Sequence, residues 1–378
     1  MKEQNKSFGQ VSRRKFLGSA ATAAAAIAVM PSLASSCTSA STGSPAGSKL
    51  NSKFAGVQMG TITYSFRNMD PGIEGVLKAC VESGCSSIEL MSGGIEDWCG
   101  APKAPPRPQM TPMPAAAPAT APAAAAAPAT APAAPGAAAT VMPTGGGRAP
   151  LTPEQQAAQD KYTADIKVWR LAAPMEKFAE LKKMFDDAGV SIHVVKWSPA
   201  RWSDEEIDYA FLSAKALGAW GVSDELTLDA AKKLGPFAEK HGMYASLHTH
   251  GQFGTAVFEQ ETLVPALAVS PAVMLNFDCG HFYGSTGVHP NTIIDKYKDR
   301  IKEIHLKDKT GPNTTPANTN QIWGQGETPL IDVLKKIRDE KIPFFCDIEL
   351  EYPVPAWSTS VKEVQTCLRY AKEVLLNE

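Results

Sequence analysis

The sequence predicts an α/β fold, a single (β/α)8 barrel, from three observations. Short apolar runs alternate with amphipathic runs from about residue 54 onward, which is typical of strands and helices in alternation. Eight of the apolar runs have the length of strands. The chain has 378 residues. Without its terminal and low-complexity segments, roughly 280 remain, which is the size of one such barrel.

The eight predicted strands lie within residues 54–66, 86–91, 190–197, 218–223, 243–250, 272–281, 301–308 and 343–351. Between them, apolar residues spaced three and four apart predict helices at 73–84, 175–189 and 330–341. The first two of these helices end on glycine, a common helix stop.

The N-terminal residues 1–37 resemble a twin-arginine signal peptide. Arg13 and Arg14 precede an apolar run, as in export signals, although a basic amphipathic arm is an alternative. Cys37 follows small residues and is a candidate lipidation site; the alternative is a soluble exported protein. Residues 38–52 then form a flexible tether, and the barrel covers 53–378. We therefore expect passage through the twin-arginine export machinery to the periplasm or a lipid-anchored place at the cell envelope.

Residues 101–150 interrupt the barrel after its second strand. Proline and alanine dominate this segment, with almost no charge or aromatic side chain. Such a composition cannot bury enough apolar surface to offset the entropy of ordering, so we expect a disordered insertion.

Composition excludes several classes of function. The net charge is −2, which provides no electrostatic footprint for nucleic acid. No internal run is long and apolar enough to span a membrane, so we expect membrane contact only through a lipid at Cys37. Six cysteines follow Cys37 without a CxxC pair, and we expect most of them to be buried as small hydrophobic residues.

The C-terminal ends of the predicted strands are polar. In a barrel these ends form the active site. Taken in chain order, they offer Glu89, Lys196, His248, His250, Asp278, His281, His305, Lys307, Asp308, Asp347, Glu349 and Glu351. Each has an ordinary alternative. A histidine there can be structural, Asp278 can cap a turn, "HLKD" can be a surface cluster, and "IELE" can face solvent.

Together these side chains predict a metal site. Four successive strands each offer imidazole or carboxylate ligands at the same end of the barrel. That set suits one divalent ion of Mn, Zn, Co or Fe, with Mg less favoured beside two imidazoles. Strand alternation places His248 and His250 on one side of the barrel, and likewise Asp347, Glu349 and Glu351.

The motifs "LHTHG", "DCGH", "IHLKD", "WGQGETPL" and "DIELE", in this order, resemble the sugar phosphate isomerase/epimerase family with its xylose isomerase-like barrel. The resemblance covers roughly residues 54–376 apart from the insertion. It implies metal ligands at His248, Asp278, His305 and Glu349, a substrate contact at His281, and a family lysine at Lys307. His248 stands where the ketose epimerases of this group carry a glutamate, which puts a symmetric two-glutamate epimerisation in doubt.

The expected function is a metal-dependent sugar isomerase or epimerase. Glu349 is the predicted base that removes a proton next to a carbonyl, through a metal-held enediolate. His250, His281, Lys196 and Lys307 are expected to orient the substrate or carry the second proton. The expected substrate is a small sugar or glycoside, on whose rings Trp197 and Trp202 could stack.

Three alternatives remain open at this point. The first is a lyase or hydratase acting on 3-keto-sugars or glycosides, the second is a non-catalytic sugar-binding lipoprotein, and the third is a metal-dependent nuclease.

Overall fold

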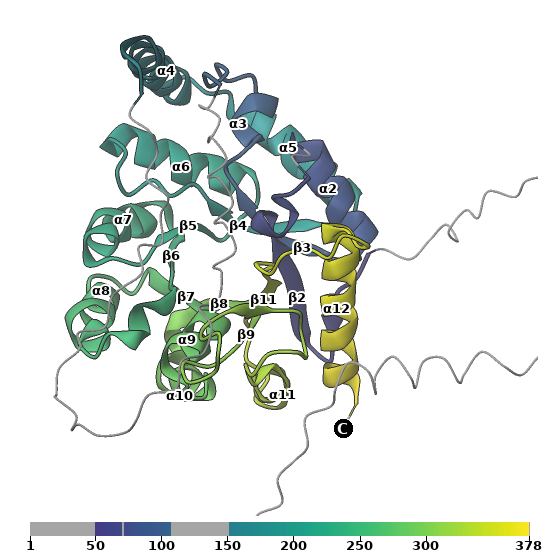
Figure 1. Cartoon of the computed structure of the whole chain (residues 1–378). Coiled ribbons are helices and arrows are strands. Elements are labelled where there is room, and N and C mark those ends of the chain that lie inside the picture. Colours follow the sequence, from purple (N-terminus) through teal and green to yellow (C-terminus); the bar gives the residue numbers. More distant parts are fainter. Residues whose placement is uncertain (1–49, 70–71, 107–150, 378) are drawn as a thin grey trace, which may run out of the picture. The chain divides into compact units, whose positions relative to one another are not determined.

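A computed structural model describes residues 50–69, 72–106 and 151–377 of the chain. Eight parallel strands form a closed barrel in the order β2-β11-β8-β7-β6-β5-β4-β3, and β2 also pairs with β3 (Figure 1). The barrel strands are β2 Val57–Ile62, β3 Ser87–Met91, β4 Ser191–Lys196, β5 Gly221–Glu225, β6 Tyr244–His248, β7 Val273–Asp278, β8 Ile301–Leu306 and β11 Phe345–Ile348. The predicted (β/α)8 barrel and all eight of its strands are confirmed.

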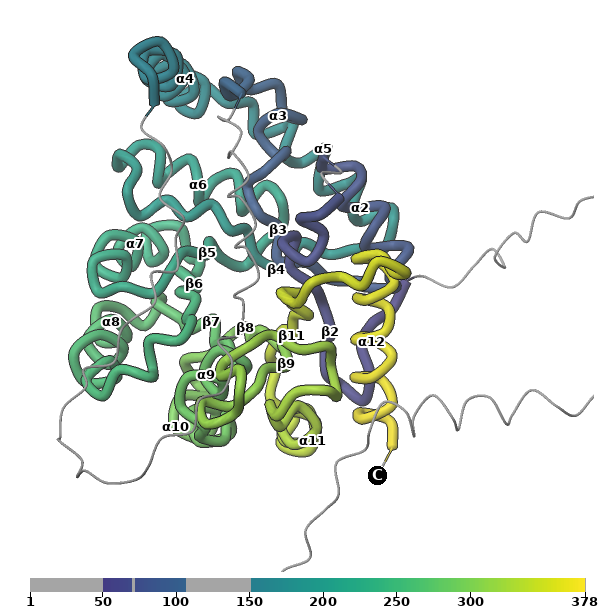
Figure 2. Tube along the Cα trace, viewed as in Figure 1, coloured from purple at the N-terminus to yellow at the C-terminus, as the bar shows by residue number. Residues whose placement is uncertain are grey.

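Helices connect successive strands and surround the barrel. Their bounds are α2 Gly72–Ser83, α5 Met175–Asp187, α6 Asp204–Ala216, α7 Leu228–His241, α8 Val264–Ala268, α10 Asn291–Tyr297, α11 Leu330–Asp339 and α12 Ser360–Leu376. The three helices predicted from apolar spacing correspond to α2, α5 and α11. Figure 2 shows α12, from the end of the chain, beside α2 from its beginning, and the two helices pack together.

Short strands and helical turns lie at the ends of the barrel strands and in the loops. They are β1 Lys53–Phe54, β9 Asp308–Lys309, β10 Asn320–Gln321, α3 Ile95–Trp98, α9 Cys279–Thr286, the 3-10 helices Thr63–Phe66, Gly251–Gly254 and Lys298–Arg300, and a π-helical turn Glu259–Leu263. The antiparallel pair of β9 and β10 forms a small sheet of its own beyond β8.

The barrel interior contains a polar layer, which we call the inner layer: Ser87, His193, Ser246, Glu303 and Asp347. All five side chains are buried. Four of them stand two residues before a polar residue nearer the strand end: Ser87 before Glu89, Ser246 before His248, Glu303 before His305, and Asp347 before Glu349. Because side chains alternate along a strand, each such pair faces the same way, and the inner layer lies directly beneath the polar strand ends.

The chain divides into two compact units. One comprises residues 1–101 and 170–378, with the barrel, and the other comprises residues 102–169. The second unit contains most of α4, Pro153–Leu171, a helix that the sequence analysis did not predict. The predicted signal peptide, Cys37 and most of the tether lie outside the described residues, as do residues 107–150 of the insertion.

The six cysteines after Cys37 are all buried and free, as expected. They are Cys80, Cys85, Cys99, Cys279, Cys346 and Cys367. Among the described residues, no helix combines the length and the apolar character needed to cross a membrane.

Candidate metal centre

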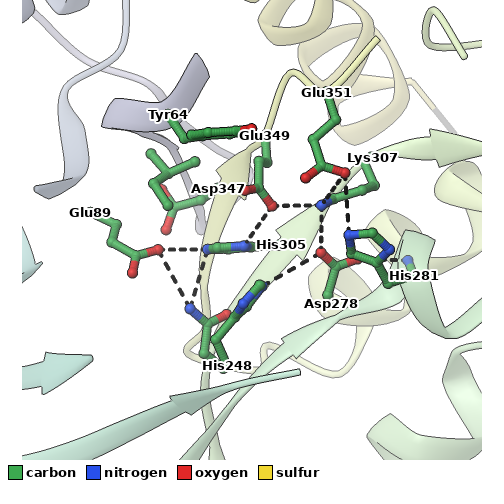
Figure 3. Close-up of polar contacts among 12 residues, drawn as sticks. Tyr64, Glu89, His248, Asp278, His281, His305, Lys307, Asp347, Glu349 and Glu351 are labelled. Atoms are coloured by element: carbon green, nitrogen blue, oxygen red, sulfur yellow. Dashed lines mark hydrogen bonds and ion pairs between the residues drawn. The ribbon is translucent and has the colours of Figure 1, made fainter. Parts of the chain in front are cut away.

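Four side chains from four neighbouring strands meet at the C-terminal mouth of the barrel. His248 ends β6, Asp278 ends β7, His305 lies in β8, and Glu349 follows β11. All four are buried, and one ligand atom from each lies within 4.8 Å of the others. We call these four residues the mouth cluster (Figure 3). The family resemblance had pointed to this same set.

Asp278 has two tasks, one for each oxygen. Its Oδ1 accepts a hydrogen bond of 2.7 Å from the backbone N–H of His281 and so caps α9. Its Oδ2 lies 3.6 Å from His248 Nε2 and 2.8 Å from Lys307 Nζ. The turn-capping alternative is therefore correct for one oxygen, while the other oxygen faces the mouth cluster.

His305 lies between two carboxylates (Figure 3). Its Nδ1 is 2.9 Å from Glu349 Oε2, and its Nε2 is 2.6 Å from Glu89 Oε2. A neutral imidazole carries only one proton and cannot donate to both. Although burial opposes the charged form, Glu349 and Glu89 raise the pKa of His305 well above its usual value. The site therefore attracts a positive charge, either a second proton on His305 or a metal ion at Nδ1.

His248 provides the second imidazole. It is 1% exposed, and neither of its ring nitrogens has a hydrogen-bond partner within the described part of the chain. Two buried nitrogens without partners are costly unless something binds them. Two imidazoles and two carboxylates, all buried and convergent, fit a divalent transition metal or zinc.

Lys307 holds the acidic side of the site together. Its buried Nζ lies 2.8 Å from Asp278 Oδ2, 2.7 Å from Glu349 Oε2 and 3.0 Å from Glu351 Oε2. Burial disfavours its charge, but these three carboxylates raise the pKa of Lys307 above its usual value. In turn, burial opposes ionisation of Glu349, while Lys307 and His305 hold the pKa of Glu349 well below its usual value. Glu349 is therefore ionised and can accept a proton.

A second group of polar side chains borders the mouth cluster. His281 Nε2 is 3.2 Å from Glu351 Oε2, and His281 Nδ1 is 3.5 Å from Lys309 Nζ. Burial lowers the pKa of His281, which favours its neutral form. Lys309 was missed in the sequence analysis. It continues the alternation of His305 and Lys307 by two further residues, and that spacing was the signal available.

His250 and Lys196 meet at Glu225, the last residue of β5. Lys196 Nζ lies 2.8 Å from Glu225 Oε1, and His250 Nδ1 lies 3.1 Å from Glu225 Oε2. His248 and His250 were expected to face the same side of the barrel, and both rings face Glu225. Neither Lys196 nor His250 belongs to the mouth cluster. Glu225 itself was missed, because "SDE" at the end of β5 carries no histidine to draw attention to it.

Two other strand-end carboxylates lie outside the mouth cluster. Asp347 faces the interior, as the alternation predicted, but it lies in the inner layer, 2.9 Å from His193 Nε2. Asp308 accepts hydrogen bonds of 2.8, 2.9 and 3.2 Å from the backbone N–H groups of Gly324, Gly326 and Thr328. It therefore fixes the "GQGET" loop.

The two tryptophans suggested for stacking on sugar rings are occupied elsewhere. Trp197 is 3% exposed and packs against Trp202 and Tyr209. The guanidinium of Arg170 lies over the Trp202 ring, 3.7 Å from the ring centroid. Tyr64, 38% exposed, is the aromatic residue that borders the site in Figure 3.

Comparison with known proteins finds a family model that is similar to the second half of the chain. Residues 213–371 match the family model of the xylose isomerase-like TIM barrel. Over 132 residues, 35% of this chain and 37% of the relative, the chain is 31% identical to an inosose dehydratase of Clostridium beijerinckii. Over 83 residues, 22% of this chain and 28% of the relative, it is 36% identical to an inosose dehydratase of Clostridium botulinum. The chain therefore covers only 37% and 28% of the length of these two curated relatives.

A solved structure shares the fold over most of its length. A xylose isomerase domain protein of Planctomyces limnophilus aligns over 84% of this chain and 97% of that chain, with a TM-score of 0.51 and 13% sequence identity. At this identity the likeness concerns the fold alone.

Proposed function

We propose that this barrel, whose residues 213–371 match the family model of the xylose isomerase-like TIM barrel, is a divalent-metal enzyme acting on a keto sugar or keto-cyclitol. The reaction would begin with removal of the proton next to the carbonyl. The observation that carries the proposal is the mouth cluster, in which one ligand atom from each of four buried residues lies within 4.8 Å of the others, one of them from an ionised glutamate.

In this proposal His248, Asp278, His305 and Glu349 hold the ion. Bound there, a divalent ion would polarise the substrate carbonyl and stabilise the negative charge that develops on its oxygen. Glu349 takes the α-proton, because it is ionised and stands at the open end of the barrel. Lys307 supports this step by holding Asp278 and Glu349 in place, and its firmly held proton makes it a poor shuttle.

The fate of the enolate decides the class of reaction. Return of a proton to the neighbouring carbon gives isomerisation or epimerisation, and loss of a β-hydroxyl group gives a lyase. The sequence analysis placed isomerisation first. The relatives named inosose dehydratases favour elimination of water, so we place the lyase first and keep the isomerase as the second candidate.

Elimination needs an acid for the departing hydroxide, and Lys309 acting through His281 is our candidate. Neutral His281 lies between Glu351 and Lys309, so its Nδ1 can take a proton from the Lys309 ammonium as its Nε2–H gives one to the leaving group. The C–H proton goes to Glu349, the C–O bond breaks, and the hydroxide leaves as water with the proton from His281.

The first experiment is metal analysis of the purified full chain beside His248→Ala, Asp278→Ala and the control His241→Ala, a histidine paired with Asp208 on the helix layer. We expect about one divalent ion per chain in the wild type and the control, and loss of the ion in both cluster variants. Absence of binding at saturating Mn²⁺, Zn²⁺ and Co²⁺ would contradict the proposal and favour a non-catalytic sugar-binding protein.

The second experiment follows turnover of an inosose and of a 3-keto-glucoside in D₂O by mass spectrometry. A lyase converts the inosose into a product lighter by water, and it expels the aglycone of the 3-keto-glucoside as the free alcohol, leaving an unsaturated keto sugar. An isomerase or epimerase gives a product of unchanged composition that carries deuterium from the solvent. Metal-loaded protein without either product would exclude both reactions on these substrates.

The location of the protein bears on which substrates reach it. We retain the proposal that residues 1–37 direct export, with the chain either soluble in the periplasm or anchored by a lipid at Cys37, where free sugars and glycosides are more accessible than phosphorylated ones. Cell fractionation of an Arg13→Lys, Arg14→Lys double variant, with mass analysis of the peptide that contains Cys37, tests both parts.

A further inference from the structure

Each imidazole of the mouth cluster has a second carboxylate on the nitrogen that faces away from the cluster. For His305, Nδ1 faces Glu349 at 2.9 Å and Nε2 faces Glu89 at 2.6 Å (Figure 3). For His248, Nε2 faces Asp278 at 3.6 Å and Nδ1 faces Glu225 at 3.5 Å. The two rings thus turn opposite nitrogens, Nδ1 and Nε2, toward the cluster.

The two outer carboxylates come from the first half of the barrel. Glu89 lies in β3 and is fully buried, and Glu225 ends β5 with 43% of its side chain exposed. Lys196, at the end of β4 between these strands, holds Glu225 through a contact of 2.8 Å. The outer carboxylates are therefore fixed in place by the fold.

We propose that Glu89 and Glu225 are positioning residues that fix the tautomers of His305 and His248, so that Nδ1 of the first and Nε2 of the second are offered to the metal. This inference rests on the proposed metal site. A carboxylate that accepts the outer N–H directs the lone pair of the other nitrogen to the ion and makes that nitrogen a stronger ligand. Lys196 then supports Glu225, and the shuttle role expected for it is replaced by a structural one.

The same residues allow a competing arrangement. Glu89 also belongs to a buried group with Glu303, His305 and Asp347, and Glu225 to a group with His248 and His250, and each group could hold an ion of its own. A histidine whose outer nitrogen binds a second ion cannot donate a proton there. Stoichiometry and tautomer state therefore distinguish the two arrangements.

The decisive measurement is long-range ¹H–¹⁵N NMR of the Zn²⁺-loaded full chain labelled at histidine, with His305→Asn and His248→Asn for assignment. We expect the Nε2–H tautomer at His305 and the Nδ1–H tautomer at His248, with about one Zn²⁺ per chain. The opposite tautomers, or two or more Zn²⁺ per chain, would overturn the proposal without any variant of the outer residues.

Zn²⁺ affinity provides the second test. Glu89→Gln removes the shorter contact and should raise the Kd for Zn²⁺ about 10–100-fold, and Glu225→Gln should raise it about 3–10-fold, because its contact is longer and more exposed. Asp224→Asn is the matched control. It removes a buried charge from the same strand, where Asp224 accepts backbone N–H groups instead of a histidine proton, and the Kd should not change.

The outcomes separate this inference from the proposed function. Wild-type protein that binds Zn²⁺ while Glu89→Gln binds it equally well refutes the positioning role and leaves the metal site standing. Wild-type protein that binds no Zn²⁺ refutes the metal site, and the inference falls with it.

Discussion

Three residues of the inner layer, Ser246, Glu303 and Asp347, lie two positions before members of the mouth cluster, yet the two groups differ in how their polar atoms are paired. In the inner layer, His193 has Ser87 Oγ 2.8 Å from Nδ1 and Asp347 Oδ2 2.9 Å from Nε2, and Ser246 donates to Glu303 at 3.1 Å; one buried oxygen, Asp347 Oδ1, has no hydrogen-bond partner in the described part of the chain. In the mouth cluster, the nitrogens of His248 make only the longer contacts of 3.5 and 3.6 Å to carboxylates, and His305 faces an acceptor on either side.

The inner layer and the mouth cluster also differ in the charges of their side chains. Burial disfavours the charged form of His193, but Asp347 and Glu303 raise its pKa to about 10. Burial and the charge of Glu89 raise the pKa of Glu303 to about 8. At neutral pH the inner layer therefore combines a charged His193 with a protonated Glu303. The inner layer is balanced by its own protons, whereas the mouth cluster has acceptors left over, which is the condition for binding a cation.

The largest expected effect is on turnover at the mouth. Glu349→Gln keeps the shape of the side chain but removes the base, so kcat should fall roughly 10²–10⁴-fold or more, because general-base catalysis contributes about that much. Turnover of the inosose by the metal-loaded variant measures it. Glu373→Gln, on the exposed face of α12, is the control, and wild-type turnover in Glu349→Gln would remove this residue from the mechanism.

Substitution of Lys307 tests whether the mouth cluster carries more negative than positive charge. Lys307→Met leaves the buried Asp278 and Glu349 and the half-buried Glu351 without their cation and should lower the free energy of unfolding by about 3–5 kcal/mol in metal-free protein. Saturating Zn²⁺ should recover part of that loss, because a metal ion supplies positive charge to Asp278 and Glu349. Urea unfolding with and without Zn²⁺ measures both, and Lys183→Met on exposed α5 is the control. A loss that Zn²⁺ does not change would contradict the comparison.

Substitution of Glu303 tests the protonation of the inner layer through the pH dependence of stability. Its pKa is raised from 4.5 to about 8 in the folded chain, so its contribution to stability is fully present below pH 4.5 and is lost as the pH rises through 8. Glutamine imitates the protonated acid at every pH. Glu303→Gln should therefore gain stability relative to wild type between pH 4.5 and pH 8. Urea unfolding at both pH values measures the difference, and a difference independent of pH would show that Glu303 is ionised in the folded chain.

Asp308 gives the smallest expected effect. It is a strand-end carboxylate like Asp278, but its partners are backbone N–H groups of one loop. Asp308→Asn weakens this set of hydrogen bonds and should cost about 1–3 kcal/mol of unfolding free energy with unchanged metal content. Thermal unfolding and metal analysis of the same sample measure both, and loss of the metal would place Asp308 in the site.

Much of this architecture could be predicted from the sequence, because it depends on short-range patterns. Strands of a closed parallel barrel are buried on both faces and stand out as apolar runs. The mouth cluster was accessible for the same reason, since barrel geometry brings strand ends together whatever their separation in sequence.

The parts that were missed depend on context that the pattern does not carry. His193 and Glu303 lie inside their strands, where a polar residue is most often turned to solvent, and only the closed barrel turns both inward. Helix α4 has one buried residue, Ile166, so it lacks the apolar stripe by which helices are recognised. The ion pair of Lys196 with Glu225 could not be predicted, because Glu225 lies on the neighbouring strand, 29 residues further along the chain.

The order of the strands along the chain separates the mouth cluster from the long connection after β3. Every member of the mouth cluster lies in β6, β7 or β8 or directly after β11, inside the segment matched by the family model. The earlier strands β3 and β5 supply Glu89 and Glu225, which contact the two histidines of the cluster. The connection that includes residues 107–150 follows β3, before any member of the mouth cluster. A change in the length of that connection therefore leaves the stretch of sequence that supplies the mouth cluster unaltered.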